Sequence, residues 1–366
     1  MSRRLIIDEL EFEVPYGKLV AKTWHEETDE SKRILVLHGW MDNSGSFDTL
    51  MPLLKHKDGL YIVALDLPGH GKSSQLPPGS SYSDLNIMME IRRCILELNW
   101  NQPVPKKKRI NGDGAGAGMV DSPSQNSIAS DCRPAKKFTI LGHSMGAGLG
   151  MYYASLFPDD VDEVISLDFI KSKTLDIEQL LNETAETIDQ FIETVPARSP
   201  FASPTLSNAT PTRNKIDKGQ VIVSQEAAII ATIEAHKQLG SLSRDDAKCL
   251  LRRSTIAVST PPNSVIYLRD LRLQSMLNLR DIWDVNKLMF ARVTCHLLIL
   301  MSTKGMYSDE KFVHQLDEAK EFFKSRAKTF HVQPIEGDHY IHMNNFKPTA
   351  EAINRYLEDP GSFKVI

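Results

Sequence analysis

Short aliphatic runs alternate along the chain with segments in which apolar residues recur at helical spacing. The aliphatic runs are residues 33–39, 60–66, 138–142, 161–168 and 295–301. Nearly continuous apolar runs of this length are typical of parallel strands that are buried on both faces. Residues 45–54, between the first two runs, are predicted as helix, and in residues 82–98, after the second run, the apolar positions follow a helical period. This alternation predicts an α/β fold with a mostly parallel, doubly wound sheet flanked by helices.

The two ends of the chain extend this pattern. Residues 10–24 are two extended stretches on either side of a Pro-Tyr-Gly turn, which predicts an antiparallel hairpin at the start of the sheet. Near the C-terminus we expect a helix over 309–327, a strand over 330–337 and a last helix over 348–357. These elements complete the sheet begun in the first half.

Two segments interrupt the alternation of strands and helices. Residues 101–137 contain KKKR followed by a Gly/Ser/Pro/Asn-rich tract, which we interpret as a solvated, disordered surface insertion. Residues 169–283 are mostly amphipathic helix, split by a Ser/Pro/Thr-rich loop at 199–212, and predict a helical cap inserted after the strand expected at 161–168. The expected organisation is therefore a core over 1–168, a cap over 169–283 and the rest of the core over 284–366.

The charge balance excludes several classes of partner. The 366 residues include 43 basic and 47 acidic side chains, a net charge of −4, so we expect no binding to nucleic acid. We find no apolar run long enough for a transmembrane segment. The four cysteines are widely spaced and form no C-x-x-C pair, which favours reduced thiols in an intracellular and most simply cytoplasmic protein. The sequence gives no indication of the oligomeric state or the organelle.

The sequence GHSMG, from Gly142 to Gly146, follows a predicted buried strand and precedes a helix of small residues. This is the context of the nucleophile elbow, in which a strained turn projects the serine and only glycines allow the neighbouring elements to approach. We therefore predict that Ser144 is a nucleophile.

His339, in Gly337-Asp338-His339, lies after the last predicted strand, where the histidine partner of an elbow serine is expected. A neutral imidazole there can take the proton of Ser144 and return it to the leaving group. His342 is the rival base, although we expect it to pack or hydrogen-bond locally. The H-x-x-H spacing of these histidines lacks the i, i+4 relation and the glutamate of a zinc protease, so we expect no metal.

Two backbone amides are candidates for stabilising negative charge on the substrate. The sequence LHGW ends the first predicted parallel strand, and the amide of Trp40 can form an oxyanion hole with the amide of Met145, directly after the nucleophile. His38 more simply braces this loop. Residues 66–73, DLPGHGKS, contain GKS without the spacing of a phosphate-binding loop, so Asp66 and His70 are expected to fix a turn and no nucleotide is expected.

Four segments together resemble one known family. Residues 35–54, 64–74, 140–148 and 337–343 are similar to the serine hydrolase-like proteins, Kraken-type, of the AB hydrolase superfamily, and residues 254–273 resemble that group's cap. The resemblance implies Ser144 and His339 as catalytic residues, an α/β-hydrolase fold and a helical cap. The insertion at 101–137 departs from the family pattern. The implied reaction is hydrolysis of an ester-like acyl bond in a small molecule through an acyl-enzyme, without a cofactor.

The acid that orients His339 is left open between two residues. In most hydrolases of this fold it follows the strand before the final helix pair, but that position falls near Gly305 and the nearest carboxylate, Asp309, is placed as a helix cap. Asp168 ends the strand after the nucleophile helix, where some haloalkane dehalogenases carry their carboxylate. We favour Asp168 and keep Asp309 as the alternative. A chain without a competent acid would instead be an inactive binding protein with the same fold.

Overall fold

A computed structural model describes residues 5–102, 104–105, 132–133, 135–174, 176–195, 222–276, 282–309 and 312–365. The predicted insertion lies mostly outside the described residues, and only its two ends are seen, paired as β5 (Val104–Pro105) and β6 (Cys132–Arg133). The Ser/Pro/Thr-rich loop at 199–212 also lies outside them.

The centre of the molecule is an eight-stranded sheet in the order β1-β2-β4-β3-β7-β8-β12-β13. Its first two strands form the predicted antiparallel hairpin, β2 is antiparallel to β4, and the remaining neighbours are parallel. The strands are β1 (Ile7–Val14), β2 (Gly17–Trp24), β3 (Lys32–Leu37), β4 (Leu60–Leu65), β7 (Phe138–His143), β8 (Val161–Leu167), β12 (His296–Ser302) and β13 (Thr329–Ile335). The predicted α/β fold with a mostly parallel sheet is therefore confirmed.

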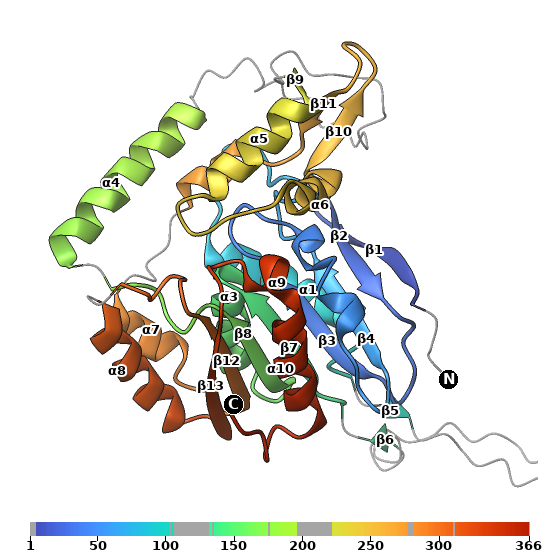
Figure 1. Cartoon of the computed structure of the whole chain (residues 1–366), viewed down its shortest axis with the longest axis vertical. Coiled ribbons are helices and arrows are strands. Elements are labelled where there is room, and N and C mark those ends of the chain that lie inside the picture. Colours follow the sequence, from blue (N-terminus) through green and yellow to red (C-terminus); the bar gives the residue numbers. More distant parts are fainter. Residues whose placement is uncertain are drawn as a thin grey trace, which may run out of the picture.

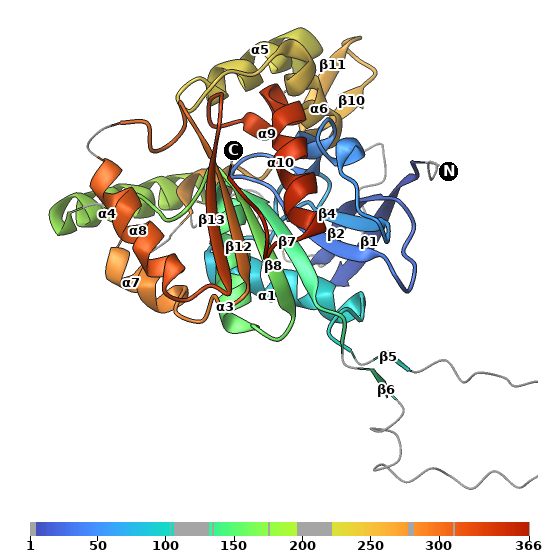
Figure 2. The same ribbon diagram turned by 60° about the horizontal axis from the view of Figure 1, so that its bottom comes forward.

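Helices cover both faces of this sheet (Figures 1 and 2). One face packs against α1 (Asp84–Glu97), α3 (Met145–Leu156), α7 (Trp283–Met289) and α8 (Val313–Lys324). The other packs against α9 (Ile341–Asn344), α10 (Phe346–Glu358) and the short 3-10 helices η1 (Ser44–Phe47) and η2 (Met51–Leu53). Leu35 and Leu37 of β3 face the first layer while Ile34 and Val36 face the second, as the two-residue period of a strand requires.

Residues 45–54, predicted as helix, form only the two 3-10 helices η1 and η2. Pro52 lies in the first turn of η2 and has no amide hydrogen to donate. A continuous α-helix would therefore lack one hydrogen bond here, and the amides of Leu50, Leu53 and Leu54 instead donate to carbonyls three residues earlier.

Apart from α7, the described part of the segment between β8 and β12 lies over the end of the sheet at which these parallel strands finish (Figure 1). Its elements are α4 (Ile177–Thr194), β9 (Ile222–Ser224), α5 (Gln225–His236), α6 (Arg244–Ser254), β10 (Thr255–Val258), β11 (Ser264–Tyr267) and the 3-10 helix η4 (Leu271–Ser275), followed by α7 beside α8. The sequence predicted a mostly helical segment and no strands within it, but β9, β10 and β11 form a small antiparallel sheet. We call residues 169–283 the cap.

Candidate active site

Ser144 lies in the turn between β7 and α3, with φ 50° and ψ −119°. A positive φ at a residue other than glycine costs on the order of 1–3 kcal/mol and persists only where the surroundings impose it. The amide of Ser144 donates to the carbonyl of Leu167 at 3.1 Å, which fixes the turn to the end of β8. The side chain is partly exposed, in contrast to its buried neighbours in the sequence.

Gly142 and Gly146 allow this turn to form. A Cβ atom at Gly146 would overlap the carbonyl of Leu37 at the end of β3, and one at Gly142 would overlap the backbone of Ala147 in α3. Both positions therefore require glycine because other backbone segments pass too close for a side chain. This is the close approach that the GHSMG motif predicts.

His339 lies in the loop after β13, and its ring is buried against Asp168. The Nδ1 atom of His339 is 2.7 Å from Oδ2 of Asp168, a residue that is completely buried at the end of β8. The other carboxylate oxygen accepts a hydrogen bond from the amide of Ser302 at 2.9 Å, and Oδ2 also accepts one from the amide of Met306 at 3.2 Å. Since a carboxylate only accepts, Nδ1 carries the proton and Nε2 is left as the basic nitrogen.

The alternative acid, Asp309, lies exposed in the loop between β12 and α8. Gly305, where an acid was expected, lies directly against the carboxylate of Asp168. A Cβ atom at Gly305 would overlap both that carboxylate and the hydroxyl of Ser302. Asp168 therefore occupies the space that a side chain at position 305 would need.

Two histidines brace the loop that carries the amide of Trp40. His38 accepts a hydrogen bond at Nε2 from the amide of Leu67 at 3.0 Å, and His70 accepts one from the amide of Met41 at 3.3 Å. Burial lowers the pKa of both rings, so they are neutral near pH 7 and serve as acceptors. The indole of Trp40 donates to the carbonyl of Leu273 in the cap at 2.8 Å.

The amides of Trp40 and Met145 are both available as donors. Met145 is the first residue of α3, where amides have no partner within the helix. Within the described parts of the chain we find no hydrogen bond from either amide. The end of β3 and the first turn of α3 approach each other closely, as the contact between Gly146 and Leu37 shows.

Comparison with known proteins places the chain in a family. Residues 32–201 match the alpha/beta hydrolase fold family. A human serine hydrolase-like protein is 32% identical over 197 residues, which cover 53% of this chain and 78% of that protein. The chain belongs to the serine hydrolase-like family. A probable serine hydrolase of Drosophila melanogaster is 28% identical over 356 residues, 96% of this chain and 88% of that protein.

Solved structures agree on the fold of this family member. A hypothetical protein from Pseudomonas aeruginosa has a TM-score of 0.66 at 22% identity, covering 97% of this chain and 99% of that one. A thioesterase domain from the curacin biosynthetic pathway has a TM-score of 0.61 at 18% identity, covering 95% and 99%. Family and fold together support a hydrolase. Among the described helices, none has the length and apolar character needed to span a bilayer.

In this serine hydrolase-like protein the cap is hydrogen-bonded to the loop that carries His339. Asp338 accepts bonds from the amide and the hydroxyl of Ser241, at 2.7 and 2.9 Å, and the amide of His339 donates to the carbonyl of Leu239 at 3.3 Å. Both cap residues belong to the connection between α5 and α6. In the sequence, Asp338 stands out only as part of the Gly-Asp-His motif, and nothing there predicts this contact.

A second link joins α6 of the cap to the core. Arg253 donates from its Nη2 atom to the buried carboxylate of Asp66, at 2.8 Å, and also contacts Glu9 of β1. Asp66 does fix a turn, as expected, by accepting from the amide of Lys72 at 2.9 Å. Its pairing with Arg253, 187 residues away along the chain, had no signal in the sequence.

Proposed function

We propose that this chain is a serine hydrolase that cleaves an ester-like acyl bond in a small molecule, with Ser144, His339 and Asp168 as its catalytic triad. The observation that carries the proposal is the buried 2.7 Å contact between His339 and Asp168, combined with the strained turn at Ser144. Membership of the serine hydrolase-like family supports the same reaction class.

The reaction follows from the protonation states that these contacts favour. Nε2 of His339 removes the proton of Ser144 as the hydroxyl attacks the substrate carbonyl, and Asp168 stabilises the imidazolium that forms. The amides of Trp40 and Met145 bind the negative oxygen of the tetrahedral intermediate. His339 then protonates the leaving group. A water molecule activated by the same nitrogen hydrolyses the acyl-enzyme and releases the acid product from Ser144.

A fluorophosphonate probe tests the proposal directly, because it reacts covalently with an activated serine. The wild-type protein should be labelled, Ser144→Ala should not, and the variant should lose on the order of a millionfold in hydrolysis of a short aryl ester. Circular dichroism and melting temperature serve as folding controls for the variant. If a folded wild-type protein were neither labelled nor active, the chain would be a binding protein with a hydrolase fold.

A further inference from the structure

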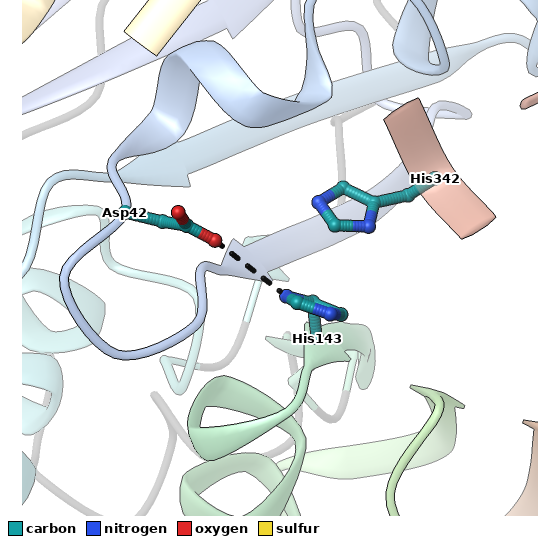
Figure 3. A group of neighbouring side chains, drawn as sticks. All are labelled: Asp42, His143 and His342. Carbon is teal, nitrogen blue, oxygen red and sulfur yellow. Dashed lines mark ion pairs between the residues drawn. The ribbon is translucent and has the colours of Figure 1, made fainter. Parts of the chain in front are cut away.

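A second cluster of polar side chains is buried beside the proposed triad. Asp42, His143 and His342 come from the loop after β3, the end of β7 and α9, and they converge in the interior (Figure 3). One nitrogen or oxygen atom from each lies within 4.8 Å of the others. Their exposed fractions are 3%, 1% and 0%, so bulk water does not solvate them.

The contact between His143 and the main chain of His339 fixes which ring nitrogen of His143 carries the hydrogen. Its Nε2 atom lies 3.0 Å from the main-chain carbonyl of His339. A carbonyl only accepts, so Nε2 carries the hydrogen and Nδ1 has a free lone pair. That lone pair faces Oδ2 of Asp42 at 3.7 Å, so two electron-rich atoms point at the same space. A cation or a proton donor between them would relieve this repulsion.

His342 is buried without a hydrogen-bond partner for either ring nitrogen among the described residues. The ring is fully buried against Phe47 and His143. A buried polar group without a hydrogen-bond partner destabilises the folded state. A neutral imidazole has one nitrogen lone pair that can bind a metal ion.

We propose that Asp42, His143 and His342 form a binding site for a divalent transition-metal ion, with Zn²⁺ as the best fit. Two imidazole nitrogens and one carboxylate are a common zinc ligand set that leaves a fourth position open. The surrounding contacts are those that hold zinc ligands in place. His143 donates its other nitrogen to a carbonyl, and the second oxygen of Asp42 lies 3.1 Å from Nε2 of His236 in the cap.

This set of ligands differs from the histidine pair that the sequence suggested. In the sequence, His342 forms an H-x-x-H spacing with His339, whereas in the structure it lies beside residues about 200 and 300 positions away. Zinc bonds of 2.0–2.1 Å put neighbouring ligand atoms about 3.4 Å apart, so ligand atoms now up to 4.8 Å apart must approach each other by up to about 1.4 Å. One water molecule at about 2.8 Å from each atom also fits the present spacing, so the experiment must separate these two occupants.

Zinc uptake should be measured on the full chain without an affinity tag and in the Ser144→Ala background. This choice makes the result independent of the proposed hydrolysis. After prolonged incubation with Zn²⁺ and desalting, elemental analysis should find about one Zn²⁺ per chain, and the melting temperature should rise. His342→Leu should retain none and show no rise. His56→Ala, which removes a histidine near the surface, should bind as the parent does.

Two outcomes would overturn the site. Equal uptake by the parent and His342→Leu would place the metal elsewhere, and no uptake by the parent would leave water as the occupant. If His342→Leu fails to fold, Asp42→Asn provides the second test, because it keeps an oxygen facing His236 while removing the negative charge. The proposal then predicts at least a tenfold loss of zinc affinity.

A second part of the inference rests on the proposed function. His143 directly precedes Ser144 and bonds to the backbone of His339, so drawing it toward a metal ion would displace the proposed triad. We expect Zn²⁺ to inhibit ester hydrolysis, EDTA to restore it, and His342→Leu to resist inhibition. Zinc uptake without inhibition would refute this coupling while leaving the site intact.

Discussion

Replacing Asp168 by asparagine would test the acid of the proposed triad. The side chain is fully buried and accepts three hydrogen bonds, from His339, Ser302 and Met306. An asparagine of the same shape has only one oxygen that can accept. Its NH2 group must take the place of either Oδ2, which faces the ring of His339 and the amide of Met306, or Oδ1, which faces the amide of Ser302.

Both orientations are harmful. If the NH2 group faces His339, Nδ1 becomes the acceptor and the proton moves to Nε2, the nitrogen that must act as the base. If it faces the amide of Ser302, two donors oppose each other in the interior. In serine hydrolases the wrong tautomer costs about 10⁴-fold in kcat, so we expect a loss of 10³-fold or more for Asp168→Asn, about 4 kcal/mol or more of transition-state stabilisation.

The assay is initial-rate hydrolysis of a short aryl ester, with Asp309→Asn as the matched control. Asp309 is exposed, and its replacement should change the rate by less than threefold. Melting temperatures of both variants show whether each is folded. A folded Asp168→Asn variant within tenfold of the wild-type rate would refute the assignment, and a large loss in Asp309→Asn alone would transfer the role to that residue.

Three further predictions concern residues around the site. Adding Gly305→Asp to Asp168→Ala should raise the rate at least tenfold, because the new carboxylate enters the space vacated at position 168 once the hydroxyl of Ser302 rotates away from the new Cβ atom; no gain would show that a carboxylate at position 305 does not reach the histidine. Arg253→Met should lower the free energy of unfolding in urea by about 3–5 kcal/mol by stranding a buried carboxylate, whereas Arg252→Met, at an exposed position, should cost under 1 kcal/mol. Burial raises the pKa of Asp338, but the hydrogen bonds that its carboxylate accepts outweigh burial, so the net pKa is lowered and the carboxylate stabilises the fold above about pH 4 but not below it. The difference in melting temperature between wild type and Asp338→Asn should therefore shrink from pH 7 to pH 3.5, and a constant difference would contradict this prediction.

The core of the fold was predictable because its signals are local. Parallel strands buried on both faces must be apolar at nearly every position, so β3, β4, β7, β8 and β12 appear as aliphatic runs. The turn at Ser144 requires glycines at fixed offsets, which makes it readable as a motif. The loop carrying His339 is likewise fixed by its place after the last strand.

The remaining features depend on contacts between distant residues. The cap was expected to be helical, yet β10 and β11 pair across a short turn whose strands are too brief to give a clear alternation. The pairing of Asp168 with His339 spans 171 residues, so two aspartates remained candidates until the sheet brought one of them to the ring. The cluster around His342 was unpredictable for the same reason, because Asp42 and His143 lie far from it along the chain.

The hydrogen bonds between Ser241 and Asp338 have a consequence for how substrate reaches the serine. These bonds fasten the connection between α5 and α6 to the residue next to His339. Any motion that lifts this part of the cap must either break them or pull the histidine loop along with it. Opening the cap to admit substrate would then move His339 out of position, and closing the cap would return it. The protein would therefore be ready to react only after it has closed over its substrate.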